Sequence, residues 1–264
     1  MRTIAVSSGK GGVGKTNIVA NLALALVKKG YKVLIFDADL GLANIDVLLG
    51  LSPEKDIRDV ISGEATFREI TIWTEHGFGV IPASSGVVEL TRLDSSEKLL
   101  LKDQFEEMVQ GIDFLFFDLA AGIADNVLFF NLVAQERIII TTPEPTAMAD
   151  AYALIKVLFR RYQIKRFYFL VNMLKDTTEG KTVYQQISMV VERFLGPVGL
   201  TYLGGLREDG CVTRAVRRQE PFLKVCPQAG VSRDLIAVCE KLLKLKPEIQ
   251  GGLEALWSEA FQVV

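Results

Sequence analysis

Short apolar runs alternate along the chain with longer segments in which apolar residues recur at helical spacing. The short runs are rich in Val, Ile, Leu and Phe and seldom alternate with polar residues, which is typical of parallel strands buried on both faces. The sequence therefore predicts strands at Thr3–Ser7, Lys32–Phe36, Phe78–Pro82, Phe114–Asp118, Arg137–Thr141, Phe167–Asn172 and Leu200–Gly204.

The longer segments predict helices between these strands, at Lys15–Lys29, Ser96–Gln110, Ala147–Arg161, Val183–Leu195 and Ser232–Leu245. Strands that alternate with helices form a parallel sheet with right-handed crossovers. We therefore expect an α/β fold with a doubly wound, mostly parallel sheet and helices on both faces. No low-complexity linker or internal repeat divides the chain, so one domain is expected over residues 1–250.

Residues 251–264 form a separate amphipathic segment. Its apolar residues recur at helical spacing and would form one stripe: Leu253, Leu256, Trp257, Ala260, Phe261 and Val264. Such a helix could contact a membrane, with Trp257 as its anchor, or dock back onto the domain. Its polar face carries Glu254 and Glu259 but no Lys or Arg, so both interpretations stay open.

Charge narrows the classes of function. The chain has 264 residues, with 30 Lys and Arg against 32 Asp and Glu, so no overall field attracts nucleic acid or an anionic membrane. Arg214, Arg217 and Arg218 form only a small local cluster, and nucleic acid is not an expected partner. No signal peptide and no run of about 18 apolar residues is present. We expect a cytoplasmic protein that is at most peripheral on the inner face of the cell membrane.

Cysteine usage points to the same compartment. Cys211, Cys226 and Cys239 are too few and too scattered for a disulfide framework, and no C-x-x-C motif occurs. This fits a reducing cytosol, and we expect three inert thiols. The only histidine, His76, lies in a turn-like segment and is predicted to be solvated, whereas Trp73 is predicted to lie in the core.

A glycine-rich loop follows the first predicted strand. Its residues are Gly9, Lys10, Gly11, Gly12, Val13, Gly14, Lys15 and Thr16, and Asn17 continues into a predicted helix. This fits G-x-x-x-x-G-K-[ST] in the strand–loop–helix context that the motif requires. Its backbone N–H groups can wrap a β-phosphate beside the positive end of the helix. Lys15 is expected to neutralise the β- and γ-phosphates, and the Thr16 hydroxyl to bind Mg²⁺.

Three carboxylates end two other predicted strands. Asp37 and Asp39 follow the second strand, and Asp118 ends the apolar run that starts at Phe114. Ligands of open α/β sheets lie at the carboxyl ends of the strands, so these side chains should face the phosphate loop. One can hold a Mg²⁺-bound water and another can orient the attacking water. Asp118 is predicted to polarise Mg²⁺ through water.

The string KGGVGKT, from Lys10 to Thr16, resembles the deviant phosphate loop of the ParA/MinD family of ATPases. The resemblance implies a MinD-like fold with ATP and Mg²⁺ as ligands. It also implies that Lys10 reaches across a dimer interface to the partner's nucleotide. Asp39 would then handle the attacking water, Asp37 would belong to the metal shell, and Leu119–Gly122 would sense the γ-phosphate.

The same resemblance assigns a base-binding side. Asn172 closes a predicted strand, and its position alone favours a residue in a strand-ending turn. The family places its base-recognising Asn there, and the amide can donate and accept at the adenine edge. Arg207, Glu208 and Asp209 resemble the second base-contacting loop, although Arg207 stands where relatives commonly carry Pro.

Three stretches are similar to the flagellar-number regulators of this family, FlhG and FleN: Asp37–Leu51, Asp150–Leu158 and Asn172–Gly180. The similarity implies a slow, Mg²⁺-dependent ATPase that dimerises with ATP and controls the number or placement of flagella. Its partners would be a second copy, the GTPase FlhF, and C-ring components or a flagellar transcription regulator. These regulators usually carry an N-terminal activator extension, and the present sequence begins at the phosphate-loop strand, so stimulation of FlhF in the usual way is not expected.

Other functions within the family remain alternatives. Division-site selection by a MinD-like ATPase comes next, and DNA partition of the ParA type is less favoured because the chain lacks a basic stripe. Iron-protein reductases need cluster-binding cysteines in the central third of the chain, and none precedes Cys211. Amidotransferase-type synthases would need a further glutaminase domain.

Overall fold

The computed structural model describes residues 1–39, 44–82 and 95–247, which build an eight-stranded sheet in the order β3-β4-β2-β5-β1-β6-β7-β8. The strands are β1 (Arg2–Ser8), β2 (Val33–Ala38), β3 (Ile72–Trp73), β4 (Gly79–Ile81), β5 (Phe114–Ala121), β6 (Glu136–Thr141), β7 (Arg166–Leu174) and β8 (Gly199–Arg207). Neighbouring strands pair in parallel, except that β3 is antiparallel to β4 at the edge. The predicted α/β fold and the predicted strands are confirmed, while β3 was not predicted.

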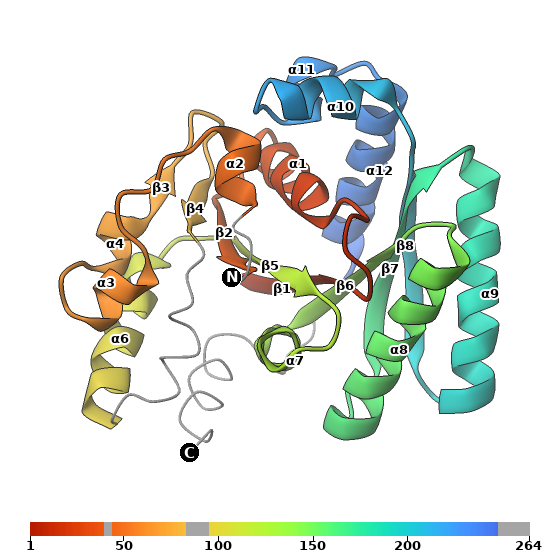
Figure 1. The fold of residues 1–264 in the computed structure, drawn as a ribbon, viewed down its shortest axis with the longest axis horizontal. Coiled ribbons are helices and arrows are strands. Elements are labelled where there is room, and N and C mark those ends of the chain that lie inside the picture. Colours follow the sequence, from red (N-terminus) through yellow and green to blue (C-terminus); the bar gives the residue numbers. More distant parts are fainter. Residues whose placement is uncertain (40–43, 83–94, 248–264) are drawn as a thin grey trace.

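Helices cover both faces of this sheet (Figure 1). One layer contains α1 (Lys15–Val27), α2 (Ile45–Leu49), α10 (Gly210–Arg217), α11 (Phe222–Val225) and α12 (Gly230–Lys244). The other contains α3 (Ile57–Ile61), α4 (Phe67–Ile70), α6 (Ser95–Met108), α7 (Asp125–Val133), α8 (Pro145–Tyr162) and α9 (Thr177–Leu195). The sequence did not predict α7, because this helix is apolar on nearly all sides and therefore shows no helical periodicity.

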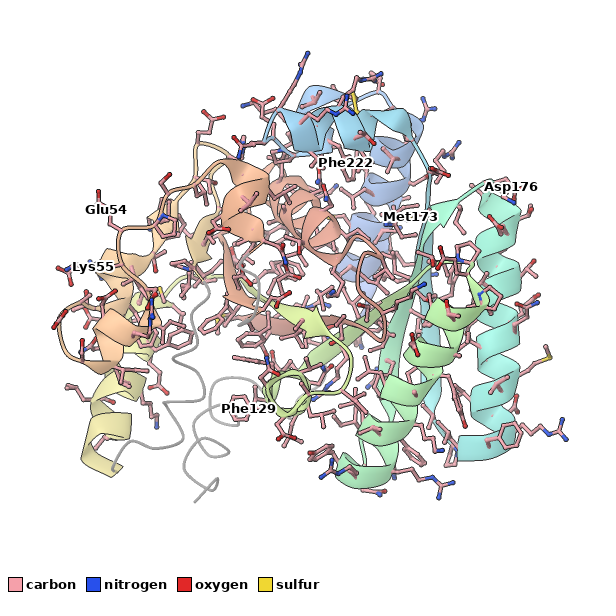
Figure 2. All side chains as sticks on the ribbon, in the orientation of Figure 1. Glu54, Lys55, Phe129, Met173, Asp176 and Phe222 are labelled. Atoms are coloured by element: carbon pink, nitrogen blue, oxygen red, sulfur yellow. A yellow bond between two sulfur atoms is a disulfide. The ribbon has the colours of Figure 1, made fainter. Side chains whose placement is uncertain are left out.

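Successive strand residues pack into opposite cores. Along β5, Phe114 and Phe116 contact the layer of α1 and α12, whereas Leu115 and Phe117 contact the layer of α7 and α8. Because side chains alternate across a strand, a strand covered on both faces needs apolar residues at every position. This double burial is why the strands appear in the sequence as continuous apolar runs, and side chains fill both layers beside the sheet (Figure 2).

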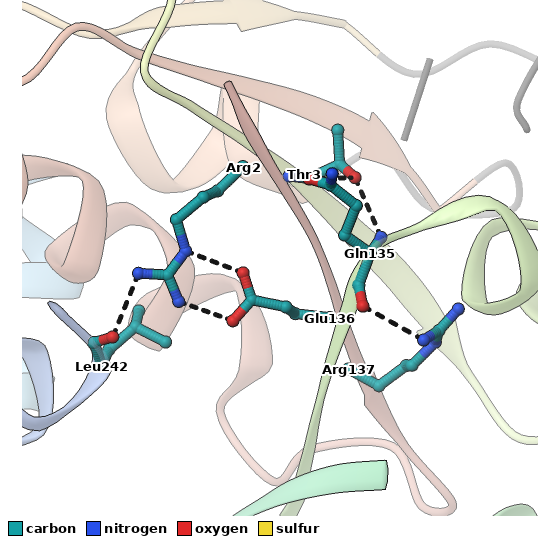
Figure 3. Close-up of polar contacts among 6 residues, drawn as sticks. All are labelled: Arg2, Thr3, Gln135, Glu136, Arg137 and Leu242. Carbon is teal, nitrogen blue, oxygen red and sulfur yellow. Dashed lines mark hydrogen bonds and ion pairs between the residues drawn. The ribbon is translucent and has the colours of Figure 1, made fainter. Parts of the chain in front are cut away.

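A polar network joins the amino ends of the central strands, opposite the phosphate loop (Figure 3). Arg2 forms a two-point ion pair with the buried carboxylate of Glu136, with Nε to Oε1 at 2.7 Å, and donates to the Leu242 carbonyl at 3.1 Å. The Gln135 N–H donates to the Thr3 hydroxyl at 2.9 Å. These contacts join the end of α12 to β1 and β6 at the edge of the sheet opposite the phosphate loop.

Two predictions about single side chains are wrong. Trp73 was expected in the core, but it lies on the edge strand β3 and is 56% exposed. His76 was expected in solvent, but its side chain is only 6% exposed and its ring lies 6.0 Å from that of Phe78. Local sequence indicates a turn, yet it cannot show which side chain the turn folds onto the core.

The predicted C-terminal segment, residues 251–264, lies outside the described residues, as does Leu40–Ala43 of the acidic loop. Among the helices that the structure describes, none has the length and apolar character needed to cross a membrane.

Candidate nucleotide-binding site

A cavity of about 910 Å³ opens at the carboxyl ends of the strands. Its phosphate-loop side is lined by Gly11, Gly12, Gly14, Lys15, Thr16 and Asn17, with Asp39 and Asn44 nearby. Its opposite side is lined by residues at the ends of β7 and β8 and on α10 and α11, including Asn172, Met173, Arg207, Glu208, Asp209 and Phe222. Figure 2 labels Met173 and Phe222 on these walls. The volume is in the range of small-ligand sites.

The phosphate loop connects β1 to α1, and two of its glycines are required by close contacts. A Cβ at Gly9 would lie 2.1 Å from the backbone carbonyl carbon of Asp150 on α8. Gly14 has φ +89°, and a Cβ there would lie 2.5 Å from Nδ2 of Asn172. Gly14 also precedes α1, whose first amides receive no side-chain cap. These amides are therefore suited to bind phosphate oxygens.

Lys15 lies against the carboxylates. It is 8% exposed, and burial lowers the pKa of its ammonium while the nearby Asp118 and Asp39 raise it. Burial disfavours the charged form of a lysine, and nearby carboxylates favour it. Lys15 thus stands where the phosphate loop faces the ends of β2 and β5.

Asp37 and Asp118 are register partners on the adjacent strands β2 and β5. Both are buried, at 1% exposure each. Burial, together with the charge of Asp118, raises the pKa of Asp37 to about 7, although the Asp39 N–H donates to its Oδ1 at 3.0 Å. Burial raises the pKa of Asp118 to about 6, against the lowering effect of the Thr16 hydroxyl and of Lys15. Two carboxylates so placed repel each other unless a cation or a proton intervenes.

This acidic pair fits Mg²⁺. The buried Oδ1 of Asp118 has no hydrogen-bond partner in the described part of the chain, and such an orphaned atom is costly unless a ligand satisfies it. The donors here, Asp37, Asp118 and the Thr16 hydroxyl, are all oxygen atoms, which Mg²⁺ prefers. The described residues contain no group of three or more His, Cys, Asp and Glu side chains suited to a metal, so further ligands would come from phosphate and water.

Asp39 lies at the rim of the same cavity. It follows β2 directly, and its Oδ2 accepts a hydrogen bond from Asn44 Nδ2 at 3.3 Å. Asp39 lines the cavity together with Lys15, so its carboxylate can meet a ligand, whereas Asp37 and Asp118 are buried beneath it. The fold therefore brings the three predicted carboxylates to one place, with Asp37 and Asp118 buried and Asp39 at the cavity surface.

Lys10 points away from the cavity. Its ammonium donates to Glu144 Oε2 at 2.7 Å and to the Thr146 hydroxyl at 3.1 Å, at the N-terminus of α8. Both side chains of the ion pair are exposed, at 42% for Lys10 and 63% for Glu144. Gly9 and the buried Val13 likewise do not line the cavity. In the single chain, Lys10 is thus held on the outer side of the phosphate loop.

The residues predicted to contact the base line the cavity, but several are already engaged. Asn172 Nδ2 donates to the Val13 carbonyl at 2.8 Å. The Arg207 guanidinium binds both carboxylate oxygens of Asp234, at 2.7 and 2.8 Å. Asp209 caps α10 by accepting from the Cys211 N–H at 2.9 Å. Arg207 is therefore fixed to α12, which leaves its side chain less free to meet a base.

The sequence did not indicate several lining residues. Met173 follows Asn172 with φ +58°, a left-handed conformation that is uncommon for a residue with a side chain, and it lies where the β7–β8 register shifts. Gln219 donates to the Val47 carbonyl at 2.8 Å and so joins α2 to the segment after α10. Met173 belongs to the stretch Asn172–Gly180 but was given no role there, and Gln219 belongs to no motif, so only the three-dimensional arrangement places both at the cavity.

The cysteine prediction is wrong. Cys211 and Cys226 are joined by a disulfide, and only Cys239 is a free, buried thiol. The two sulfurs are separated by 15 residues and meet because α10 and α11 fold back on each other beside the cavity. Spacing along the chain could not show this contact.

The sheet, the glycine loop before α1 and the buried acidic pair define a P-loop nucleotide-binding protein. A ParA family model, described as "NUBPL iron-transfer P-loop NTPase", matches residues 1–243. The chain therefore belongs to the ParA/MinD family of P-loop ATPases.

Two curated relatives carry flagellar names. The antiactivator FleN of Pseudomonas aeruginosa is 40% identical over 242 residues, which cover 92% of this chain and 86% of FleN. The flagellum site-determining protein YlxH of Helicobacter pylori is 38% identical over 235 residues, covering 88% of this chain and 78% of YlxH. The chain is thus similar to both along most of their length.

Solved structures match the fold. A chain of the MinC:MinD cell division protein complex of Aquifex aeolicus superposes with a TM-score of 0.73 and 25% identity, covering 96% of this chain and 100% of that one. MinD of Pyrococcus horikoshii, solved with Mg-ADP, gives 0.71 and 24%, covering 92% and 96%. The MinD-like architecture predicted from the sequence is confirmed.

Proposed function

We propose that this protein is an ATP-driven dimerisation switch that regulates the number or placement of flagella. The observation that carries the proposal is the similarity to FleN and YlxH, at 40% and 38% identity over most of the chain. The cavity supports it, because Lys15, Thr16 and Asp39 line it on the phosphate-loop side and Asn172 lines it on the opposite side. The proposal therefore assigns ATP binding and hydrolysis to this cavity, and the regulation of flagella to the protein that contains it.

For ATP hydrolysis we assign roles by position. The phosphate-loop amides and Lys15 bind the β- and γ-phosphates, since Lys15 lies at the cavity beside the first turn of α1. Asp39, which reaches the cavity from β2, orients the attacking water. Asn172 and the loop Arg207–Asp209 form the base-binding side. Slow turnover is expected, because a switch gains from a long-lived ATP state.

Thr16, Asp37 and Asp118 would hold Mg²⁺, the first directly and the carboxylates through water. When bound, the ion neutralises charge on the phosphates. The orphaned Asp118 Oδ1 and the raised pKa of Asp37 support this assignment, because both features make the empty acidic pair unfavourable. Mg-ADP in MinD of Pyrococcus horikoshii is consistent with it.

Dimerisation would employ Lys10. Its contact with Glu144 and Thr146 keeps the ammonium off its own cavity, so the side chain is free to exchange this partner for the nucleotide of a second copy. Because this ion pair is exposed, it contributes only roughly 0–1 kcal/mol to stability. ATP would thus favour a sandwich dimer, and hydrolysis would return the monomer.

Partners and location follow from the same proposal. We propose FlhF, C-ring components or a flagellar transcription regulator as partners, in the cytoplasm or at the inner face of the membrane. The name "antiactivator" of the relative FleN fits the last of these. We further propose that residues 1–250 form the ATPase domain and that 251–264 dock onto a membrane or onto the domain.

The test is to count flagella per cell by electron microscopy in a deletion strain and in a Lys15→Ala strain. The proposal predicts a changed number or placement in both, with cell division unaffected. Normal flagella together with minicells would instead support division-site selection. Normal flagella with plasmid or chromosome loss would support DNA partition.

A further inference from the structure

A disulfide closes the segment that forms one wall of the nucleotide cavity. Cys211 is the second residue of α10, and Cys226 directly follows α11. Between them lie Val212, Thr213, Val216 and Phe222, all of which line the cavity. The crosslink thus joins the two ends of this cavity wall.

Hydrogen bonds hold the same segment to the body of the protein at separate points. Leu223 N–H donates to Asn21 Oδ1 at 2.8 Å, and the Gln219 amide to the Val47 carbonyl at 2.8 Å. The segment therefore stays attached when the disulfide opens, but its ends gain freedom. Since a crosslink reduces chain freedom and a rigid site binds more tightly than a loose one, opening it should weaken binding in the cavity without unfolding the protein.

The surroundings of the two sulfurs favour exchange. Arg214 Nη2 lies 3.5 Å from Cys226 Sγ, and Cys226 is partly exposed. Cys211 is fully buried but lies in the first turn of α10. The Arg214 cation beside Cys226 stabilises the incoming thiolate of a reductant there, and the helix N-terminus stabilises the thiolate of Cys211 as the leaving group. Asp209, which caps α10, partly offsets this at Cys211.

The third cysteine provides the contrast. Cys239 is fully buried on α12, and burial raises the pKa of its thiol to about 11. It has no disulfide partner, so it remains a thiol throughout. The disulfide, by contrast, can be reached through the partly exposed Cys226, whose sulfur lies beside the Arg214 guanidinium.

We propose that Cys211 and Cys226 form a thiol–disulfide exchange site, and that a dithiol reductant opens it and weakens nucleotide binding. This inference rests on the proposed binding of ATP in the cavity. A thiolate of the reductant attacks the exposed Cys226 Sγ, the S–S bond breaks, and Cys211 leaves as a thiolate that takes up a proton. The second thiol of the reductant then attacks the mixed disulfide, releasing Cys226 as a thiol and the reductant as its own disulfide.

Thiol counting and nucleotide binding test the proposal on the full chain. Protein purified without reductant is alkylated under denaturing conditions, before and after native treatment with dithiothreitol. One thiol is expected before treatment and three after it. The dissociation constant for Mg-bound N-methylanthraniloyl-ADP is expected to rise by about threefold to tenfold on reduction, because pre-organisation is lost.

Four variants sharpen this experiment. Cys226→Ser, at a partly exposed position, should bind the nucleotide as the reduced protein does and should not respond to dithiothreitol. Cys239→Ala should respond as the wild type does. Arg214→Gln should slow the reduction severalfold, with Arg214→Lys restoring most of the rate. An unchanged rate in Arg214→Gln would overturn the role of Arg214.

Three free thiols before treatment, or equal nucleotide affinity in both redox states, would overturn the exchange site while leaving the ATPase proposal intact. A protein that bound no nucleotide in either state would overturn the proposed function and this inference with it.

Discussion

At the scale of single residues, the buried carboxylates Asp37 and Asp118 dominate the energetics of the site. They are adjacent in register, and Lys15 is the cation that lowers the pKa of Asp118. A buried charge without full compensation costs free energy of folding. The site is therefore arranged for a ligand at some expense of stability, as is common where binding groups are gathered.

Asp37→Asn should make the nucleotide-free protein more stable at pH 8. The folded state raises the pKa of Asp37 from 3.8 to about 7, so the unfolded state releases its proton first as the pH rises. Stability is consequently lost between about pH 4 and 7. We expect the melting temperature at pH 8, without Mg²⁺, to rise by up to roughly 8–16 °C, because a pKa raised from 3.8 to about 7 corresponds to at most about 4 kcal/mol in a domain of this size.

The gain should shrink at pH 5, where Asp37 is already neutral. Asp113→Asn, at an exposed position, is the matched control and should change little at either pH. Thermal denaturation followed by circular dichroism measures both. A variant that is less stable than the wild type at pH 8 would contradict the account of Asp37.

At the scale of elements, α8 controls Lys10. Glu144→Gln removes the ion pair at the start of α8 while the Thr146 hydroxyl remains. Because an exposed pair contributes at most about 1 kcal/mol, we expect ATP-dependent dimerisation to tighten by up to about fivefold. Glu192→Gln removes the same charge from an exposed position on α9 and should have no effect. Sedimentation at several protein concentrations measures the dimer dissociation constant, and weaker dimerisation of Glu144→Gln would contradict this role.

Another element, α7, is fastened to the strand that precedes the phosphate loop. Asn131 on α7 donates to the Ser7 hydroxyl at 2.7 Å and accepts from it through Oδ1 at 3.1 Å, and both residues are fully buried. Asn131→Ala leaves the Ser7 hydroxyl without this partner, so the free energy of unfolding should fall by about 1–3 kcal/mol. Denaturant unfolding measures the loss.

A double variant is the control for this contact. If the hydrogen bond carries the effect, Ser7→Ala added to Asn131→Ala should cost little more. Simple addition of the two single losses would show that the residues act separately.

At the scale of the whole molecule, the sequence predicted the sheet well and its contacts poorly. Strands such as Phe114–Asp118 were predictable because burial on both faces demands continuous apolar residues, and Gly9–Thr16 because the phosphate loop is local in sequence. The contacts of Arg207 with Asp234 and of Cys211 with Cys226 depend on how helices return to the sheet. No local pattern encodes those approaches.

The ATP-dependent dimer is the central claim, and light scattering tests it most directly. In the Asp39→Ala variant, hydrolysis should fall by roughly 10²-fold or more, so that the ATP state persists. We expect a mass of one chain, 29.2 kDa, in Mg-ADP and of twice that in Mg-ATP, and loss of the ATP-dependent dimer when Lys10→Ala is added. The same mass in both nucleotides, or a dimer that does not need Lys10, would contradict the account.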